Sequence, residues 1–261
     1  MNKCSGKKKC FALCGMLFLI MIVATPAMSR DMVVSVAYLP NISESPDKGV
    51  FIDLIKAMGE TYTEGTFKIS VFPFNRSIDN VVNGKADFHI PMLRNPNIPE
   101  EKLPFRYASV SMGKVYFVIY SHKDKPITKE MLEKAKSVNP FPYKIVMLRG
   151  LENFSSFPVE ASESSLEQMM QMVDKKRIDA VVHAQEEADF VLEQLKLKDI
   201  HRDFYDSFDD VVIIPKGEQG DAVDRVVSQS LKTLAANGRL EELHSKVHVP
   251  YKDWQPEKMN W

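Results

Sequence analysis

The sequence predicts an α/β protein whose strands are mainly parallel and flanked by helices. Three observations support this fold class. Residues 67–91 contain two strand patterns joined by a short helical pattern, and residues 129–195 repeat a similar alternation of helix and strand. A run of branched apolar residues at 210–215 then precedes a long amphipathic pattern. Strands that alternate with helices along a chain are typical of layered α/β folds.

The unit at residues 67–91 is the centre of this prediction. Apolar residues alternate with other residues at 67–71, the period of a half-buried strand. We expect Asn75 or Ser77 to cap a helix that ends at the Asn-Gly pair 83–84, and a second strand at 86–90. Two strands joined by one helix in so short a span form a right-handed parallel βαβ unit.

The carboxyl ends of these strands are the predicted binding site, because ligands of open α/β sheets bind there. They carry FPFNR at 72–76 and PMLR at 91–94. Arg76 and Arg94 can each clamp a carboxylate with two hydrogen bonds. Aromatic residues near the strand ends can form a platform for a flat or cationic group; the candidates are Tyr38, Phe51, Phe72 and Phe74.

The other elements follow from apolar periodicity and capping signals. Ser164 and Glu167 are expected to form a capping box for a helix with Met and Leu at helical spacing, which we interpret as core. A further helix is expected to start near Leu151. The remaining strands are expected at 32–39, 111–121, 144–148, 178–183 and 210–215, and the remaining helices around 50–58, 129–136, 188–195, 223–234 and 239–247.

Residues 1–29 are predicted to be a cleavable signal peptide. Four lysines precede an uncharged apolar run at 11–24, and small residues follow at 27–29. The run is short for a membrane span, which needs about 20 residues, although an uncleaved anchor is the alternative. All three cysteines lie in this leader, so the exported chain is expected to have no disulfide and no cysteine metal site.

The charge of the exported chain argues against nucleic-acid binding. Removing the four leader lysines from 34 basic residues leaves 30 against 35 acidic residues, a formal charge of −5, and no basic stripe is present. The histidines are scattered, and His244 and His248 are expected to be solvated near the C-terminus. Metal sites need clustered ligands, so neither a metal nor another cofactor is predicted.

Three segments resemble the bacterial extracellular solute-binding proteins of the polar-amino-acid type (solute-binding protein family 3). They are GVFIDL at 49–54, PFNR at 73–76 and VVNGKAD at 81–87, and LKTLAANGRL at 231–240 is similar to the family's closing segment. The resemblance implies a two-lobe periplasmic-binding-protein fold of type II. Lobe 1 would comprise 30–120 plus 211–261 and lobe 2 would comprise 121–210, with a ligand cleft between them and two strands crossing as a hinge.

The chain departs from the family where an amino acid would be held. The family's arginine for the α-carboxylate is replaced by Lys102, and its aspartate for the α-amino group is replaced by Ala184. Lysine does not reproduce the planar fork of arginine. Arg149 and His183, at strand ends of the second lobe, are the expected substitutes. We therefore expect a small polar or anionic solute that is not a standard α-amino acid.

The resemblance implies a monomeric periplasmic binding protein that delivers its solute to the membrane permease of an ABC importer. Two alternatives stay open at this point. One is a periplasmic enzyme on the same scaffold, similar to cyclohexadienyl dehydratases, in which Glu186 or Lys102 would act as general acid. The other is an accessory protein that senses a ligand and signals to a membrane partner.

Overall fold

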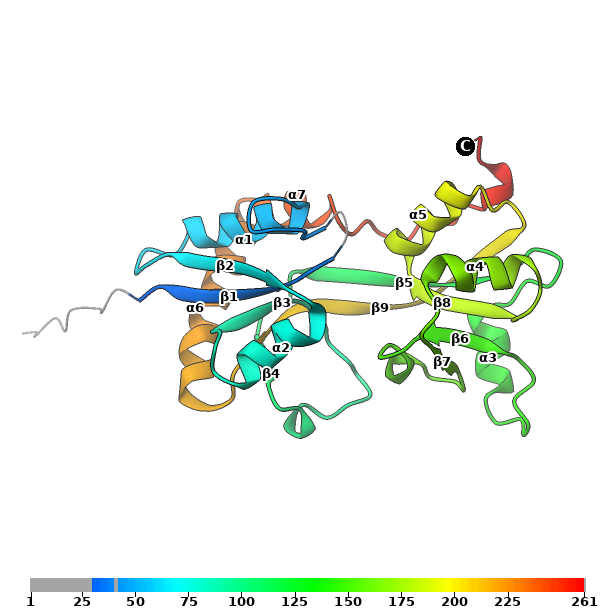
Figure 1. The fold of residues 1–261 in the computed structure, drawn as a ribbon, viewed down its shortest axis with the longest axis horizontal. Helices are drawn as coiled ribbons and strands as arrows, with labels where there is room; N and C mark the ends of the chain where they lie inside the picture. Colours follow the sequence, from blue (N-terminus) through cyan, green and yellow to red (C-terminus); the bar gives the residue numbers. More distant parts are fainter. Residues whose placement is uncertain (1–29, 40–41, 261) are drawn as a thin grey trace, which may run out of the picture.

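The computed structural model describes residues 30–39 and 42–260. The predicted signal peptide, residues 1–29, lies outside the described residues. Figure 1 shows an elongated molecule with two lobes joined by two long strands, β5 (Gly113–His122) and β9 (Ile200–Ile214). No helix of the described chain is long and apolar enough to cross a membrane.

Hydrogen bonds join all strands into one sheet with the order β2-β1-β3-β9-β5-β8-β6-β7, and β4 pairs with β9 outside this path. The first lobe contributes β1 (Met32–Ala37), β2 (Phe67–Phe72), β3 (Phe88–Leu93) and β4 (Arg106–Tyr107). The second lobe contributes β6 (Ile145–Leu148), β7 (Glu160–Ser162) and β8 (Ala180–Ala184). Strands β1–β3 are parallel, as are β6–β8, whereas β5 and β9 are antiparallel to each other.

Helices cover both faces of the strands in the first lobe. The helices are α1 (Val50–Glu60), α2 (Phe74–Val82), α6 (Gly217–Ala236) and α7 (Arg239–His244), and a 3₁₀ turn lies at Glu100–Lys102. Val34 and Val36 of β1 are fully buried in one core together with apolar residues of α1, α6 and α7. Burying a side chain of this size stabilises the fold by about 1.5–3 kcal/mol. Ser35, between them, faces α2 on the other side of the sheet.

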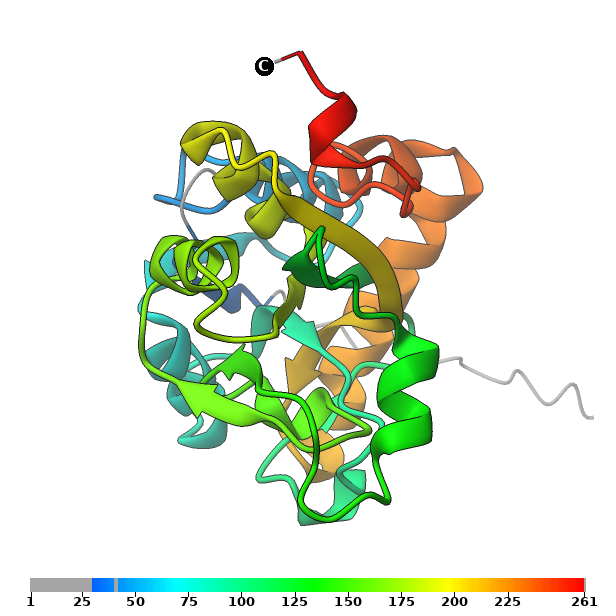
Figure 2. The same ribbon diagram turned by 90° about the vertical axis from the view of Figure 1, so that its right-hand side faces the viewer.

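The second lobe has the same layered construction. Its helices are α3 (Lys129–Ala135), α4 (Leu166–Asp174) and α5 (Gln185–Leu195), and it has a 3₁₀ turn at Glu152–Phe154. Ile145 and Met147 of β6 pack in one core with residues of α3, whereas Val146 packs in another with residues of α4 and α5. Figure 2 shows these helices on opposite sides of the strands. Two covered faces explain why β6 and β8 are almost wholly apolar.

The segment after α7 crosses from the first lobe to the second (Figure 1). The Arg202 guanidinium on β9 donates hydrogen bonds to the carbonyls of Lys252 and Trp254, and it pairs with both carboxylate oxygens of Asp189 at 2.8 Å. A last 3₁₀ turn follows at Pro256–Lys258. The C-terminal segment thus adds a third connection to the two strands. The residue boundaries proposed for the lobes stay a prediction.

The following details of the predicted elements were wrong. The strand expected at 210–215 begins at Ile200. The helix expected after Asn75 begins at Phe74, with Pro73 as its N-cap residue. The capping box lies one residue further on than expected, between Ser165 and Gln168.

Candidate functional site

The carboxyl ends of the parallel strands in the two lobes face each other. We call the ends of β1–β3 the first edge, the ends of β6–β8 the second edge, and the space between them the interlobe region. Leu93, the last residue of β3, and Gly113 of β5 both pair with Asp210. Ala184, the last residue of β8, pairs with Phe117 of β5. From 113 to 117 is four residues of strand, or about 13 Å, so the edges are separated by the size of a small molecule.

Two aromatic rings are exposed at the first edge, as the sequence predicts. The Tyr38 amide donates a 2.7 Å hydrogen bond to the Phe72 carbonyl, which places Tyr38 beside the end of β2. Its side chain is 49% exposed, and that of Phe74 is 39% exposed. The Phe74 ring makes an edge-to-face contact with the buried His89 ring, with 5.5 Å between the ring centroids.

Arg76 lies in the first turn of α2 and is exposed. Because Pro73 has no side chain that can cap the helix, no side-chain hydrogen bond caps the first amides of α2. Such amides and the helix dipole favour an anion. Among the described residues, no hydrogen bond or ion pair engages the Arg76 guanidinium. The start of α2 therefore combines an available cation with available N–H donors.

A buried polar network holds α2 on the sheet. The Ser77 hydroxyl lies 2.6 Å from His89 Nδ1 and 2.9 Å from the Ser35 hydroxyl, and the Asn80 amide donates to Ser35 at 3.1 Å. Burial lowers the pKa of His89 to about 3, so this imidazole is neutral. The network was not predicted, although polar residues at inward positions of the apolar strands 32–37 and 88–93 were its signal.

Arg94 is already engaged by its own chain. Its guanidinium donates to Glu100 Oε2 at 3.3 Å and to the Ala108 carbonyl at 3.1 Å, and it lies 4.7 Å from the centroid of the Tyr107 ring. Asp209 is a further partner, at 3.8 Å. Arg94 therefore stabilises the loop after β3. Lys102, in the 3₁₀ turn of the same loop, is exposed.

Arg149 follows β6 at the second edge and is exposed, with its Nε 2.9 Å from Glu163 Oε1. The expected helix after Leu151 is wrong: only the 3₁₀ turn Glu152–Phe154 forms there, and Gly150, with φ 97°, ends the strand in a turn. So short a turn offers no helical array of amides to an anion. At this edge, an anion would therefore be attracted by the Arg149 side chain and not by the amides of a helix.

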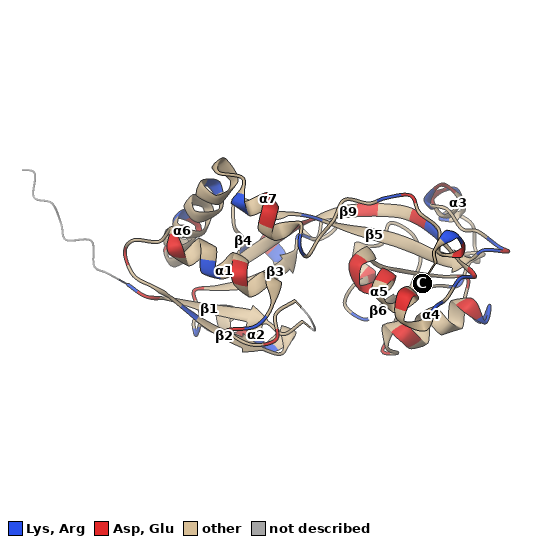
Figure 3. Ribbon diagram, turned by 90° about the horizontal axis from the view of Figure 1, so that it is seen from above, with Lys and Arg blue, Asp and Glu red and all other residues tan. Residues whose placement is uncertain are grey.

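His183 and Phe51 lie inside the lobes. His183 is 3% exposed, stacks on Phe117 at 6.3 Å between ring centroids, and points Nδ1 at Glu187 Oε2, 3.2 Å away. Phe51 is fully buried in the core of the first lobe. Glu187 itself is partly exposed in the first turn of α5, so the second edge carries a carboxylate that the sequence analysis did not single out. Figure 3 shows that α5 carries several acidic residues.

A side-chain hydrogen bond joins the loop after β3 to the second lobe beside the interlobe region. The Asn97 side-chain amide, in the loop after β3, donates to the Asn153 carbonyl in the second lobe at 2.9 Å. Two hollows lie elsewhere: one of about 380 Å³ beside Glu100, Arg106 and Asp221, and one of about 530 Å³ between α5 and the C-terminal segment. We place the candidate site between the edges because the strand ends converge there.

Solved structures with the same fold are periplasmic-binding-protein folds of type II. The GluR0 ligand-binding core from Nostoc punctiforme, in complex with L-glutamate, superposes with a TM-score of 0.57 at 16% identity, covering 84% of this chain and all of that one. A probable amino-acid ABC transporter extracellular-binding protein from Bacillus subtilis gives 0.60 at 18% identity, covering 84% and 97%. A histidine kinase sensor domain with similarity to periplasmic binding proteins gives 0.62 at 15% identity, covering 84% and 96%.

No protein-family model matches the sequence, and neither does any curated protein. The solved structures share the fold with this chain at identities of 15–18%. The chain thus has the two-lobe α/β fold that the sequence predicts.

Proposed function

We propose that this chain is a periplasmic substrate-binding protein that captures a small polar solute with an anionic group between its lobes and delivers it to an ABC importer. The proposal depends mainly on one observation: the first edge and the second edge face each other and are separated by four residues of β5. The amino-acid transporter binding proteins among the structures of the same fold support it. The predicted leader, residues 1–29, would direct export.

The first edge supplies the anion site of this proposal. Arg76 can bind a carboxylate with two hydrogen bonds, and the uncapped amides of α2 add donors with the favourable end of the helix dipole. Tyr38 and Phe74 would cover the body of the solute with their exposed rings. Arg94 would contribute only through the loop that it stabilises, since its guanidinium is already engaged.

The second edge would complete the enclosure when the lobes close. Arg149 at the second edge would exchange its ion pair with Glu163 for one with an anionic solute. Lys102, in the loop after β3, is an exposed cation on the opposite side of the interlobe region. Glu187 can accept hydrogen bonds from an amino group, because its carboxylate is partly exposed at the start of α5. Phe51 and His183, both buried, would support the site from within the lobes. We propose that β5 and β9 bend to bring these groups together.

The test is isothermal titration calorimetry of the purified exported chain against a panel of small carboxylates, phosphates, amino acids and amines. We expect one site that binds an anionic member of the panel, and native mass spectrometry of the purified protein would identify a retained solute. Absence of binding across the panel, together with conversion of prephenate to phenylpyruvate, would replace the proposal with the enzyme alternative.

A ligand-sensing role is the second candidate, favoured by the fold shared with the histidine kinase sensor domain. It predicts the same solute binding but a different partner. Chemical crosslinking in intact cells, with and without the solute, would separate the two. Crosslinks to an ABC permease support transport, whereas ligand-dependent crosslinks to a membrane kinase support sensing.

A further inference from the structure

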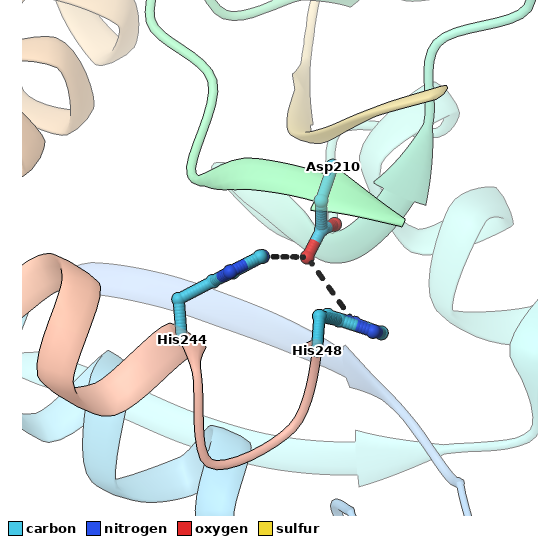
Figure 4. A group of neighbouring side chains, drawn as sticks. All are labelled: Asp210, His244 and His248. Carbon is cyan, nitrogen blue, oxygen red and sulfur yellow. Dashed lines mark ion pairs between the residues drawn. The ribbon is translucent and has the colours of Figure 1, made fainter. Parts of the chain in front are cut away.

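Three residues far apart in the fold meet at the junction of the lobes. Asp210 lies on β9, His244 is the last residue of α7, and His248 follows one turn later (Figure 4). Asp210 Oδ2 is 3.3 Å from His244 Nε2 and 3.6 Å from His248 Nε2. One donor atom from each residue can be chosen so that all three lie within 4.8 Å of one another. The expectation that the two histidines are solvated was wrong, because α7 and the segment after it pack them against β9.

Asp210 and His244 are buried, and their facing atoms lack hydrogen bonds within the described part of the chain. The Asp210 side chain is 1% exposed, and among the described residues neither of its carboxylate oxygens accepts a hydrogen bond. His244 Nε2, directed at this carboxylate, has no hydrogen-bond partner either. Burying a carboxylate without hydrogen bonds or a counter-charge is costly, and most buried polar groups are satisfied. A cation bound by these atoms would remove that cost.

The separations suit a tetrahedral metal ion. Zinc binds imidazole nitrogen and carboxylate oxygen at about 2.0–2.2 Å, which puts two ligands of a tetrahedral site about 3.4 Å apart. The two N–O separations from Asp210, 3.3 Å and 3.6 Å, bracket this value. Two histidines and one carboxylate form a three-ligand set of the kind that leaves the fourth position for water.

The surroundings fix the histidines for this role. Glu186 Oε2 of α5 lies 3.6 Å from His248 Nδ1, the nitrogen that does not face Asp210. A carboxylate on the far nitrogen of a ligating histidine is the usual outer partner in zinc sites. Gly113 leaves room for the His244 ring, since a Cβ there would lie 2.3 Å from His244 Cε1.

We propose that Asp210, His244 and His248 bind a divalent transition-metal ion of the zinc type, with Glu186 as the positioning residue for His248. This site lies at the junction of the lobes and is separate from the solute site at the start of α2. Glu186 lies on α5 of the second lobe, whereas His244 and His248 belong to α7 and the segment after it. A bound ion would therefore stabilise the present arrangement of the lobes.

The test uses the purified exported chain after dialysis against a chelator. Titration with Zn²⁺ should give one bound ion per chain, and Co²⁺ should give the strong visible absorption of a tetrahedral site. His248→Gln should abolish the cobalt spectrum and lower Zn²⁺ affinity at least 100-fold, and Glu186→Gln should lower it about 10- to 100-fold with unchanged stoichiometry. His201→Gln, which alters a histidine of β9 outside the cluster, is the matched control and should bind as the wild type does.

Folding is followed in parallel, because His244→Gln alters a buried group. Circular dichroism of His248→Gln and His244→Gln should match the wild type, and Zn²⁺ should raise the Tm of the wild type and of His201→Gln but not that of the two cluster variants. Absence of stoichiometric Zn²⁺ binding by the folded wild type would overturn the proposal and leave ion pairs alone at this place. Binding that survives both substitutions would overturn it as well.

Discussion

Asn97 donates a 2.9 Å hydrogen bond from its side-chain amide to the carbonyl of Asn153, and this bond links a loop of the first lobe to the second. A single exposed hydrogen bond contributes about 0.5–1.5 kcal/mol. Asn97→Ala should therefore shift the protein towards more open forms by a factor of about 2–13, the same energy expressed as an equilibrium constant. Small-angle scattering of the solute-free protein should show a larger radius of gyration.

Asn83→Ala is the control for this change. Asn83 also donates to a main-chain carbonyl, that of Asp79, but both residues belong to the first lobe. The scattering curve of Asn83→Ala should match that of the wild type. Equal behaviour of the two variants would contradict a role for Asn97 in holding the lobes together.

Arg76→Ala tests the proposed anion site. A hydrogen bond to a charged group contributes about 1.5–3 kcal/mol, so affinity for the solute identified by calorimetry should fall about 10- to 150-fold. Stability in urea should stay unchanged, because Arg76 is exposed and no described residue pairs with it. Arg225→Ala, an exposed position on α6, should alter neither quantity. Wild-type affinity in Arg76→Ala would remove the start of α2 from the site.

Arg94→Ala should behave differently. Because this guanidinium binds Glu100 and the Ala108 carbonyl, its loss should lower the free energy of unfolding as well as weaken solute binding through the loop after β3. Urea denaturation and calorimetry on the same sample separate the two effects. A loss of affinity with unchanged stability would instead indicate direct contact with the solute.

We expect the buried ring of His89 to make the folded protein less stable as the pH is lowered. Its pKa is about 3 in the folded chain because the ring is buried, against an ordinary value of 6.5. As pH falls below 6.5, the unfolded chain takes up a proton that the folded chain does not, until the pH approaches 3. The free energy of unfolding therefore falls by about 1.4 kcal/mol for each pH unit below 6.5, which amounts to about 2 kcal/mol at pH 5.

The measurement is urea unfolding of the wild type and of His89→Asn between pH 7 and pH 4. The asparagine removes the titrating ring while keeping a polar group near Ser77, so the free energy of unfolding should fall less steeply with decreasing pH. His201→Gln serves as the control and should keep the wild-type slope. Parallel curves for the wild type and His89→Asn would show that His89 is not the group responsible.

Trp254 anchors the C-terminal segment. The Arg202 guanidinium lies 3.8 Å from the centroid of its ring, a cation–π contact worth about 0.5–2 kcal/mol, and the Trp254 carbonyl accepts a further bond. Trp254→Ala should raise hydrogen exchange in residues 249–258 and leave that of β5 unchanged. In Lys252→Ala, which keeps the carbonyl bound by Arg202, exchange should remain as in the wild type.

The sequence predicts the first lobe well because its strands follow one another with regular apolar alternation. It places Tyr38, Phe74 and Arg76 near the ends of strands, because each comes directly after a strand or in the first turn of a helix; their role in binding stays a prediction. The first part of β9 was missed because acidic and other polar residues interrupt the segment 200–210, which is held as a strand by pairing with β5 in the folded molecule. Pairing of this kind depends on tertiary context and not on local pattern.

The sequence is a poorer guide to which single polar residues are buried in the folded protein. His244 and His248 have the one-turn spacing of a metal site, but their position near the C-terminus suggested solvent, and Asp210 is distant in the sequence. Only the packing of α7 against β9 brings the three together. Arg94 shows the same limit: a strand-end arginine looks the same in the sequence whether it awaits a ligand or is already held by Glu100.

The C-terminal segment changes how the molecule can move. If two strands were the only connection, one lobe could both bend and twist relative to the other. A third tether, fastened at Arg202 and beside the β5–β9 ribbon, resists rotation about the long axis. We expect the remaining freedom to be a bend about one axis, so that each closing movement would return the two edges to the same alignment.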